Sequence, residues 1–391
     1  MINDKINKNF IPYGKQDIDE EDIEEVVNVL KSQFITQGPK VPAFEEEICR
    51  KVKSKYAIAT NSATSSLHIA CLALGLGPGD ILWTSSITFV ASANCALYCG
   101  AKIDFVDIDS DTGLMSTIDL KRKLENAEKV GKLPKILIPV HLAGSSCDMK
   151  EIFSLSQKYG FSIIEDASHA IGGKFLDEPV GSCKYSDITI FSFHPVKIIT
   201  TGEGGIGTTN SIELANSMSE LRSHGITKDK NKFILNTVNE EWRYEQQKLG
   251  YNYRLTDIAA ALGLSQLKRL EKVVKLRNKL FENYLRLFSG LNLKMLKIPS
   301  GVYSALHLAV LRMEDKKLQN GLFEEFRKNG IGTQVHYTPV HLQPFYRQFG
   351  FKEGDYPNSE MYSKTSLSIP LYPSLQKRDQ IRIFKILEKF F

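Results

Sequence analysis

A lysine near the middle of the chain is the first residue whose surroundings indicate chemistry. Lys197 follows the apolar run ITIFSFH by a few residues and precedes the glycine-rich sequence GEGG. Burial beside a strand end partly desolvates a lysine amine and lowers its pKa, which favours the neutral nucleophile that forms a Schiff base with an aldehyde. The alternative is a solvated surface lysine, so Lys197 needs independent support.

An acidic pair at the end of the apolar run FSIIEDAS offers that support. Pyridoxal phosphate (PLP) acts as an electron sink only while its pyridine nitrogen stays protonated, and a carboxylate at a strand end is the usual partner of that nitrogen. Asp166 fits this role, and His169 could contact the cofactor ring or its phenolate oxygen. Considered singly, Asp166 could be a helix cap or a surface group and His169 a structural histidine.

Two further stretches could hold the rest of such a cofactor. NSATSSLHIA follows the strand pattern YAIAT, and the start of a helix binds phosphate through its free backbone N–H groups, with Ala63 and Thr64 as the expected phosphate cup. In SITFVASANCALY, Phe89 could stack on a flat heterocycle. The alternatives are an ordinary helix N-cap for the first stretch and core packing for Phe89.

The glycines after Lys197 do not match a dinucleotide-binding motif. GGIGTTN ends in Asn210, where G-x-G-x-x-G requires glycine, and it lies mid-chain instead of after a first strand. A hairpin or tight turn beside the lysine explains Gly204, Gly205 and Gly207 more simply. We therefore expect no NAD site.

The elements that would carry these residues follow a pattern between Tyr56 and His194 that indicates an α/β domain. Helical patterns such as SSLHIACLAL alternate with the apolar runs YAIAT, ILWTS, AKIDFVDI, KILIPVHLAG, FSIIEDAS and ITIFSFH. Apolar runs without strict alternation are typical of strands covered on both faces of a largely parallel sheet. Such sheets bind ligands at the carboxyl ends of their strands, which is where the candidate residues lie.

The pattern changes after Arg254. Apolar residues recur at intervals of three and four from Leu267 to Leu287, which predicts a connecting helix that leads out of the sheet domain. The last hundred or so residues mix short strands with a final helix and carry Pro339, Pro344 and Pro357. We expect them to form a second, smaller α/β domain.

Composition excludes several classes of protein. A hydrophobic content of 42% in 391 residues indicates a globular protein, and a net charge of +5 without a strong basic cluster argues against a nucleic-acid binder. The N-terminal MINDKINKNF lacks a signal-peptide pattern, and no window resembles a membrane span, so a cytoplasmic protein without membrane contact is expected. The cysteines are scattered along the chain, which predicts reduced, buried thiols at Cys49, Cys71, Cys95, Cys99, Cys147 and Cys183. We expect no metal site.

In this order, the phosphate turn, the aromatic residue, Asp166, Ser192-x4-Lys197, GEGG and LGYNYRLTDIAAALGLSQLKRL resemble the DegT/DnrJ/EryC1/StrS family of sugar aminotransferases. The resemblance runs from NFIPYGKQDIDEEDI to LSIPLYPSL. It implies the fold of type I PLP-dependent transferases, with a mainly parallel central sheet between helices and a smaller C-terminal α/β domain. The implied boundaries are an N-terminal arm over 1–25, a PLP-binding domain over 26–262, and a connecting helix with the small domain over 263–391.

The resemblance also implies roles for individual residues. Ser192 and the backbone at Ala63 and Thr64 resemble phosphate contacts, and Asn252 in GYNYR resembles a contact that reaches the partner's site across a homodimer interface. Relatives that dehydrate sugars carry histidine at the Schiff-base position, so Lys197 favours amination. The residues that resemble substrate contacts are Tyr13, Gln33, Phe34, Ile35, Thr36, Ala63, Ser192, Asn252, His336, Tyr337, Thr338 and Pro339.

Within the family, KSQFITQGP, KILIPVHLAGSSCDM and GTQVHYTPVHLQPFYR are most similar to transaminases of pseudaminic acid biosynthesis. This implies transfer of an amino group from L-glutamate to C4 of a UDP-linked 4-keto-6-deoxy-N-acetylhexosamine, with the cofactor alternating between PLP and pyridoxamine phosphate (PMP). One alternative is amination of another nucleotide keto-sugar, at C3 or at C4. A second is a regulatory protein that binds PLP without turnover, for which an appended DNA-binding domain would be expected; we expect none here.

Overall fold

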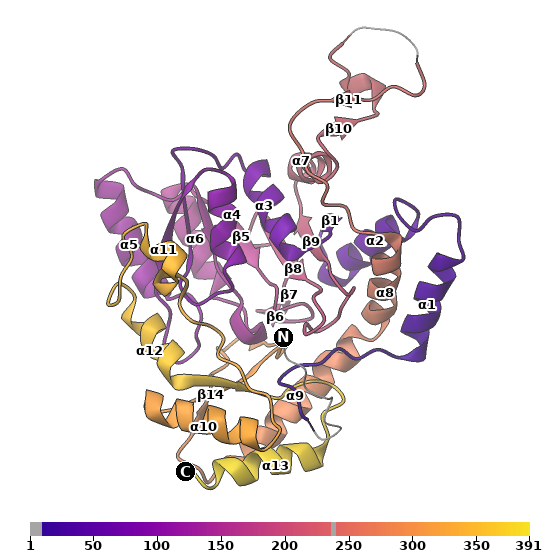
Figure 1. The fold of residues 1–391 in the computed structure, drawn as a ribbon. Coiled ribbons are helices and arrows are strands. Elements are labelled where there is room, and N and C mark those ends of the chain that lie inside the picture. The colour runs from indigo at the N-terminus through magenta and orange to yellow at the C-terminus, as the bar shows by residue number, and fades with distance from the viewer. Residues whose placement is uncertain (1–9, 236–239) are drawn as a thin grey trace.

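The computed structural model describes residues 10–235 and 240–391, which are built around a seven-stranded sheet (Figure 1). The strand order is β1-β9-β8-β5-β4-β2-β3. The pairs from β8 to β3 are parallel, and β9 runs antiparallel to both β1 and β8. The expected mainly parallel α/β sheet is therefore confirmed. The strands are β1 (Tyr56–Thr60), β2 (Ile81–Ser85), β3 (Lys102–Val106), β4 (Ile136–Ile138), β5 (Ser162–Asp166), β8 (Ile188–Ser192) and β9 (Gly205–Thr209).

Helices cover both faces of this sheet. Successive strand residues point to opposite faces, so Leu82 and Trp83 of β2 belong to different buried clusters. One face packs against α3 (Ala63–Ala73), α4 (Ala91–Tyr98) and α7 (Ile212–Arg222). The other packs against α5 (Thr117–Lys129), α6 (Met149–Tyr159), α2 (Lys40–Val52) and α8 (Asp257–Lys268). Burial on both faces explains why the strand sequences are apolar throughout.

The C-terminal part of the chain forms its own apolar cluster around a three-stranded sheet of β12 (Lys294–Met295), β14 (Ala309–Arg312) and β15 (Ser366–Ile369). The helical pattern after Arg254 forms two helices, α8 and α9 (Leu270–Leu287), separated at Arg269, instead of one connecting helix. The predicted domain boundaries remain predictions, and residues 1–9 of the expected arm lie outside the described residues. The other helices of this part are α10 (Lys316–Lys328), α11 (Pro344–Arg347), α12 (Pro357–Thr365) and α13 (Lys377–Leu387).

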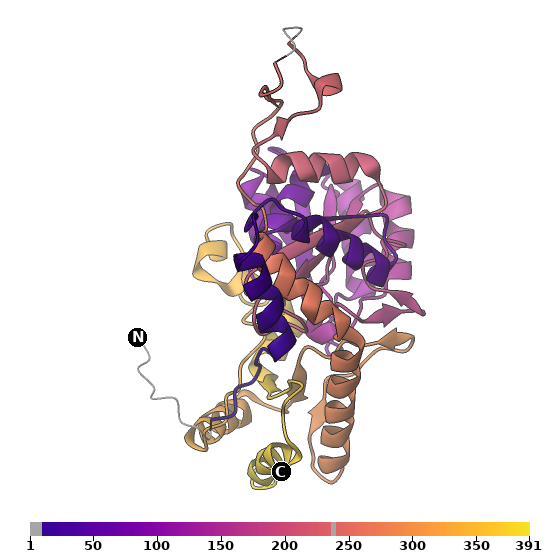
Figure 2. The ribbon, with the colours of Figure 1, turned by 90° about the vertical axis from the view of Figure 1, so that its right-hand side faces the viewer.

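The remaining elements lie outside the seven-stranded sheet and the three-stranded sheet. Helix α1 (Glu20–Leu30) packs against α8, and a segment with β10 (Ile226–Thr227) and β11 (Glu245–Gln246) projects from the body (Figures 1 and 2). A small sheet combines β6 (Lys174–Phe175), β7 (Glu178–Pro179) and β13 (Val302–Tyr303). Three 3-10 turns complete the set: η1 (Leu142–Gly144), η2 (Lys230–Lys232) and η3 (Val340–Leu342).

The fold bears on the expected buried thiols and on the expected absence of a membrane span. All six cysteines are free; five are buried, and Cys49 is half-buried instead of buried. Across residues 10–235 and 240–391, no helix is both long and apolar enough to cross a bilayer.

Candidate active site

A cavity of about 900 Å³ opens at the carboxyl ends of the parallel strands. Asp166 ends β5 and Ser192 ends β8, and both line the cavity together with the first residues of α3. The turn between β2 and α4 adds Phe89, and residues 334–338 close the cavity from the C-terminal part of the chain. The position agrees with the general rule that open α/β sheets bind ligands where their parallel strands end.

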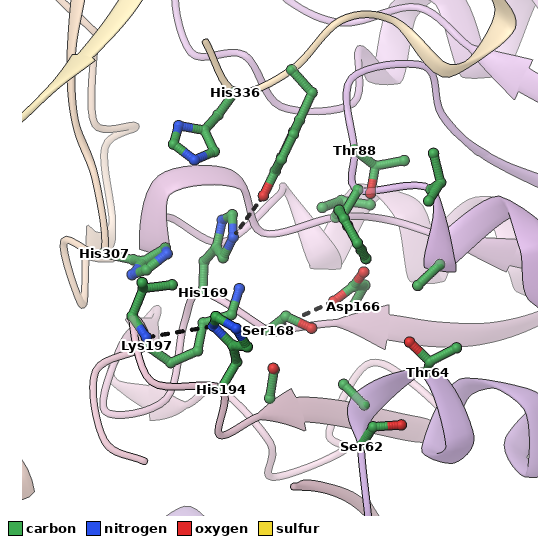
Figure 3. A pocket seen from close by; sticks show the side chains of 18 of the residues that line it. Ser62, Thr64, Thr88, Asp166, Ser168, His169, His194, Lys197, His307 and His336 are labelled. Atoms are coloured by element: carbon green, nitrogen blue, oxygen red, sulfur yellow. Dashed lines mark hydrogen bonds between the residues drawn. The ribbon is translucent and has the colours of Figure 1, made fainter. Parts of the chain in front are cut away.

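Lys197 lies in the loop between β8 and β9 and points into this cavity (Figure 3). Its backbone amide donates to the carbonyl oxygen of His194 at 2.9 Å, which closes a tight turn at this position. Desolvation lowers the pKa of the Lys197 amine to about 8, against the opposing pull of Asp166. A neutral amine is therefore accessible near physiological pH.

Asp166 is buried, and its carboxylate is held at both oxygens. The Ser92 hydroxyl donates to Oδ2 at 2.5 Å, and the Ser168 amide donates to Oδ1 at 3.1 Å. Since Ser92 uses its single proton on Asp166, it accepts the hydrogen bond from Thr88 Oγ1 at 2.8 Å. The chain Thr88–Ser92–Asp166 therefore fixes the direction in which the carboxylate faces the cavity.

The N-terminus of α3 forms another wall of the cavity. Ser62 caps the helix by accepting from the Ser65 amide at 3.1 Å, while Ala63 and Thr64 carry first-turn amides that a helix leaves without backbone partners. These amides and the positive end of the helix dipole suit a phosphate group. The first turn of α3 therefore has both the ordinary N-cap, which was the alternative interpretation, and the free amides expected to bind phosphate.

Gly205 explains why this helix start can lie so close to the sheet. A Cβ on Gly205 would lie 2.3 Å from the Ala63 nitrogen, so only glycine fits there. The glycines were expected to form a hairpin or tight turn. Strands β8 and β9 do form an antiparallel pair, but Gly205 and Gly207 lie within β9 and serve close packing instead of a turn. Gly202, with φ of +81°, is the turn residue beside Lys197.

An aromatic group closes the side of the cavity that faces the C-terminal part of the chain. His169 Nε2 lies 3.2 Å from the Tyr337 hydroxyl, and the Tyr337 ring lies 6.3 Å from that of Phe89. His336 packs against Tyr13 at 5.3 Å between ring centroids. Phe89 is 58% exposed, so the core-packing alternative for this residue is wrong.

The cavity brings together most residues that the sequence indicated. The residues that line it are Tyr13, Ala63, Thr64, Phe89, Asp166, His169, Ser192, Lys197, His336, Tyr337 and Thr338. The segment Gln33–Thr36 lies outside the cavity wall on the exposed stretch after α1, so it does not line the site in this chain. Pro339 and Asn252 are also outside; Asn252 is exposed and bridges to Ser223.

Sequence reasoning missed several residues that the structure places at the site. Thr88 and Ser92 lie on either side of Phe89 in a stretch already singled out, but Thr88 precedes α4, so no helical spacing indicated their hydrogen bond. His307 and Gln334 come from the C-terminal part and had no local signal. No group of three or more possible metal ligands occurs within the described ranges.

Comparison with known proteins identifies the family of this chain. A family model described as the DegT/DnrJ/EryC1/StrS aminotransferase family matches residues 16–388. The chain belongs to this family. It is therefore an aminotransferase, and the resemblance read from its motifs is confirmed.

Several named proteins and solved structures match nearly the whole chain. The chain is 38% identical over 387 residues to the UDP-4-amino-4,6-dideoxy-N-acetyl-beta-L-altrosamine transaminase of Campylobacter jejuni, which covers 97% of this chain and 98% of that protein. Helicobacter pylori PseC, an aminotransferase involved in the biosynthesis of pseudoaminic acid, has a TM-score of 0.89 and 30% identity over 98% of this chain and 99% of PseC. Spr1654 of Streptococcus pneumoniae, solved in a PLP form, has a TM-score of 0.87 and 29% identity over 98% of this chain and 100% of that structure; its PMP form is also known.

Proposed function

We propose that this family member transfers the amino group of L-glutamate to C4 of a UDP-linked 4-keto-6-deoxy-N-acetylhexosamine. Its Campylobacter jejuni relative is named for a UDP-4-amino-4,6-dideoxy sugar. The observation that carries the proposal is the placement of Lys197 and Asp166 in the wall of one cavity that the α3 N-terminus also lines (Figure 3). An aldehyde-reactive amine, a partner for a ring nitrogen and a phosphate site are the three groups that PLP requires.

The residues present fit PLP. When bound, the cofactor supplies an aldehyde that accepts the amino group and a protonated ring that withdraws electrons from it. Asp166 would hold the proton on the ring nitrogen, and Ser92 with Ser168 keeps its carboxylate facing that atom. The amides of Ala63 and Thr64 would bind the phosphate, with Ser192 at the neighbouring strand end.

Lys197 is the residue that moves a proton. With a pKa of about 8, a much larger share of its amines is neutral near neutral pH than for an ordinary lysine. A neutral amine in the cavity can take a proton from the carbon that carries the donated nitrogen and deliver it to the carbon on the other side of that nitrogen. Desolvation of the cavity wall is thus what allows one lysine to act both as a nucleophile and as a base.

The substrate sugar would occupy the side of the cavity lined by Tyr13, His336, Tyr337 and Thr338. Burial and the nearby Lys197 lower the pKa of His336 to about 3, so His336 is neutral and donates or accepts without adding charge. A neutral, aromatic wall suits a deoxy sugar with an N-acetyl group better than it suits an acidic sugar. This wall supports a neutral deoxy sugar as the acceptor.

We further propose a homodimer in which Asn252 completes the partner's site. Asn252 is exposed and outside its own cavity, and the segment around β10 and β11 projects from the body. This segment exposes Trp242 and Leu249, each 77% accessible, which supports their burial against a second copy. Gln33–Thr36 would reach substrate only across the same interface.

The test is a substrate panel with the purified chain, PLP and L-glutamate. UDP-4-keto-6-deoxy-N-acetylhexosamine is compared with a dTDP-linked 4-keto sugar and with a 3-keto isomer, and NMR locates the new amine on the sugar ring. We expect amination at C4 of the UDP sugar and none with Lys197→Ala. Faster amination of another keto-sugar would replace the proposed substrate, and absence of 2-oxoglutarate release with every acceptor would refute the transaminase step.

A further inference from the structure

Three of the six cysteines gather between two helices, outside the cavity. Helices α3 and α4 pack side by side and bring Cys71 of α3 together with Cys95 of α4 and with Cys99, the C-cap of α4. All three belong to one buried cluster, and none of them lines the cavity. The described ranges hold no group of three or more side chains placed to share a metal ion, so these thiols are available for thiol chemistry.

The three thiols differ in their surroundings. Cys95 Sγ donates to the Ser92 carbonyl oxygen at 3.3 Å, so its proton is already engaged. Cys71 is fully buried, and burial raises the pKa of its thiol, which therefore stays protonated. Cys99 is 7% exposed, which leaves a path for a small oxidant. Cys99 is the thiol of this group that can react first.

A buried histidine stands beside Cys99. His68 lies one turn before Cys71 in α3 and is 5% exposed. Its Nδ1 is 3.2 Å from the Tyr253 hydroxyl, which leaves Nε2 for the Cys99 thiol, with which the ring interacts. This Nε2 is enclosed and has no nitrogen or oxygen partner in the part of the chain that the structure describes. His68 is therefore placed to take a proton from Cys99.

The neighbours of Cys99 favour its thiolate. Hydrogen bonding with Cys71, and then with His68, lowers the pKa of the Cys99 thiol below its usual value. The thiolate, and not the thiol, is the nucleophile in cysteine chemistry. A thiolate that a small oxidant can reach, with a second thiol next to it, is the arrangement in which cysteines are oxidised reversibly.

We propose that Cys99 is a site of oxidation by hydrogen peroxide, with His68 as its base and Cys71 as the resolving thiol. His68 Nε2 takes the proton of Cys99, and the sulfur attacks one oxygen of the peroxide. The O–O bond breaks, Cys99 becomes a sulfenic acid, and the departing hydroxide takes the proton from His68 and leaves as water.

The second step closes a disulfide. The Cys71 sulfur attacks the Cys99 sulfur, the S–O bond breaks, and the hydroxyl leaves with the Cys71 proton as a second water. The two thiols are thus oxidised by two electrons, and one peroxide is reduced to two waters. Cys99 lies at the end of α4, and helix ends yield more easily than helix interiors, so its sulfur can close the distance to Cys71.

The test treats the full-length holoenzyme with hydrogen peroxide and follows each cysteine by alkylation and peptide mass spectrometry. We expect a disulfide that joins the peptides of Cys71 and Cys99. Cys49 is the internal control, because it is half-buried and more open than Cys99, yet burial raises the pKa of its thiol. Faster oxidation of Cys49 than of Cys99 would overturn the proposal, and this comparison requires no variant.

Three variants separate the roles within the cluster. Cys71→Ser should stop the reaction at the sulfenic acid, which dimedone traps at Cys99. His68→Gln should slow oxidation of Cys99 by about tenfold or more, because a positioned base contributes at least that much, and should leave Cys49 unchanged. Cys95→Ser is the matched control: its proton is engaged with Ser92, so the disulfide should form at the wild-type rate.

Two results with these variants would also overturn the proposal. One is an unchanged rate at Cys99 in His68→Gln, and the other is the absence of a dimedone adduct at Cys99 in Cys71→Ser. None of these measurements uses transamination, so their outcome is independent of the proposed function.

Discussion

The Ser92 hydroxyl on α4 lies 2.5 Å from the Asp166 carboxylate on β5, although 74 residues separate the two in sequence. Both residues are buried, and Thr88 donates to Ser92 in turn. A charged acceptor strengthens such a bond relative to a neutral pair. Ser92 is therefore the residue that orients the expected partner of the cofactor nitrogen.

Ser92→Ala should lower kcat/KM about tenfold, which corresponds to about 1.4 kcal/mol of lost transition-state stabilisation. The free energy of unfolding should fall by about 1 to 3 kcal/mol, because a buried carboxylate oxygen loses its donor. Steady-state kinetics and urea unfolding measure the two effects. Unchanged kinetics would show that Ser168 alone suffices to orient Asp166.

Asp166→Asn should keep the fold, since the two side chains have nearly the same shape, yet slow both half-reactions by about a hundredfold or more, because a neutral amide does not hold the pyridinium proton. Stopped-flow spectra with glutamate follow the first half-reaction, and circular dichroism checks the fold. Adding Ser92→Ala to this variant should cost little more, because the two residues act as one unit. Near-normal turnover would rule out the role of Asp166.

Gly205→Ala should destabilise the protein by about 1 to 3 kcal/mol, the usual cost of overpacking, and weaken PLP binding. The added Cβ would meet the Ala63 nitrogen at 2.3 Å and push the α3 N-terminus away from the cavity. Gly77→Ala is the control, because nothing lies within 4 Å of its Cβ position. Thermal unfolding and cofactor titration measure both effects, and equal behaviour of the two variants would contradict the packing argument.

The rate at which PLP attaches covalently to the apoprotein should rise with pH and level off above a midpoint near 8. Lys197 reacts when neutral, and desolvation lowers the pKa of its amine to about 8, so raising the pH through that value increases the reactive fraction. Borohydride should fix the cofactor to the peptide FSFHPVK. A midpoint near the ordinary lysine value, or label on another lysine, would exclude this assignment.

Mixing two inactive variants tests the shared site. Lys197→Ala removes the nucleophile, and Asn252→Asp places a negative charge against the expected phosphate of the partner's site. A heterodimer refolded from the mixture has one site with both lesions and one with neither, so part of the activity should return. If Asn252 served its own chain, every site would carry one lesion, and the heterodimers would stay inactive.

The local features of the fold could be read from the chain. Apolar runs without alternation predicted strands buried on both faces, and Ser62 followed by small residues predicted the start of α3, because both signals depend on neighbours within a few residues. For the same reason, the prediction of one connecting helix after Arg254 was wrong. A break at a single residue, Arg269, leaves the periodicity almost unchanged, and so two helices looked like one.

By itself, the sequence determined the family, the sheet class, and the choice of Lys197 and Asp166, since each of them sits at the end of a recognisable apolar run. Only the tertiary structure decided that Ser92 holds Asp166, that Tyr337 meets His169, and that Gln33–Thr36 lie outside the cavity. Hydrogen-bond partners far apart in sequence depend on how helices and strands pack, and the direction of a single proton depends on the whole network around it. Those relations have no local periodicity, and the order of residues along the chain does not record them.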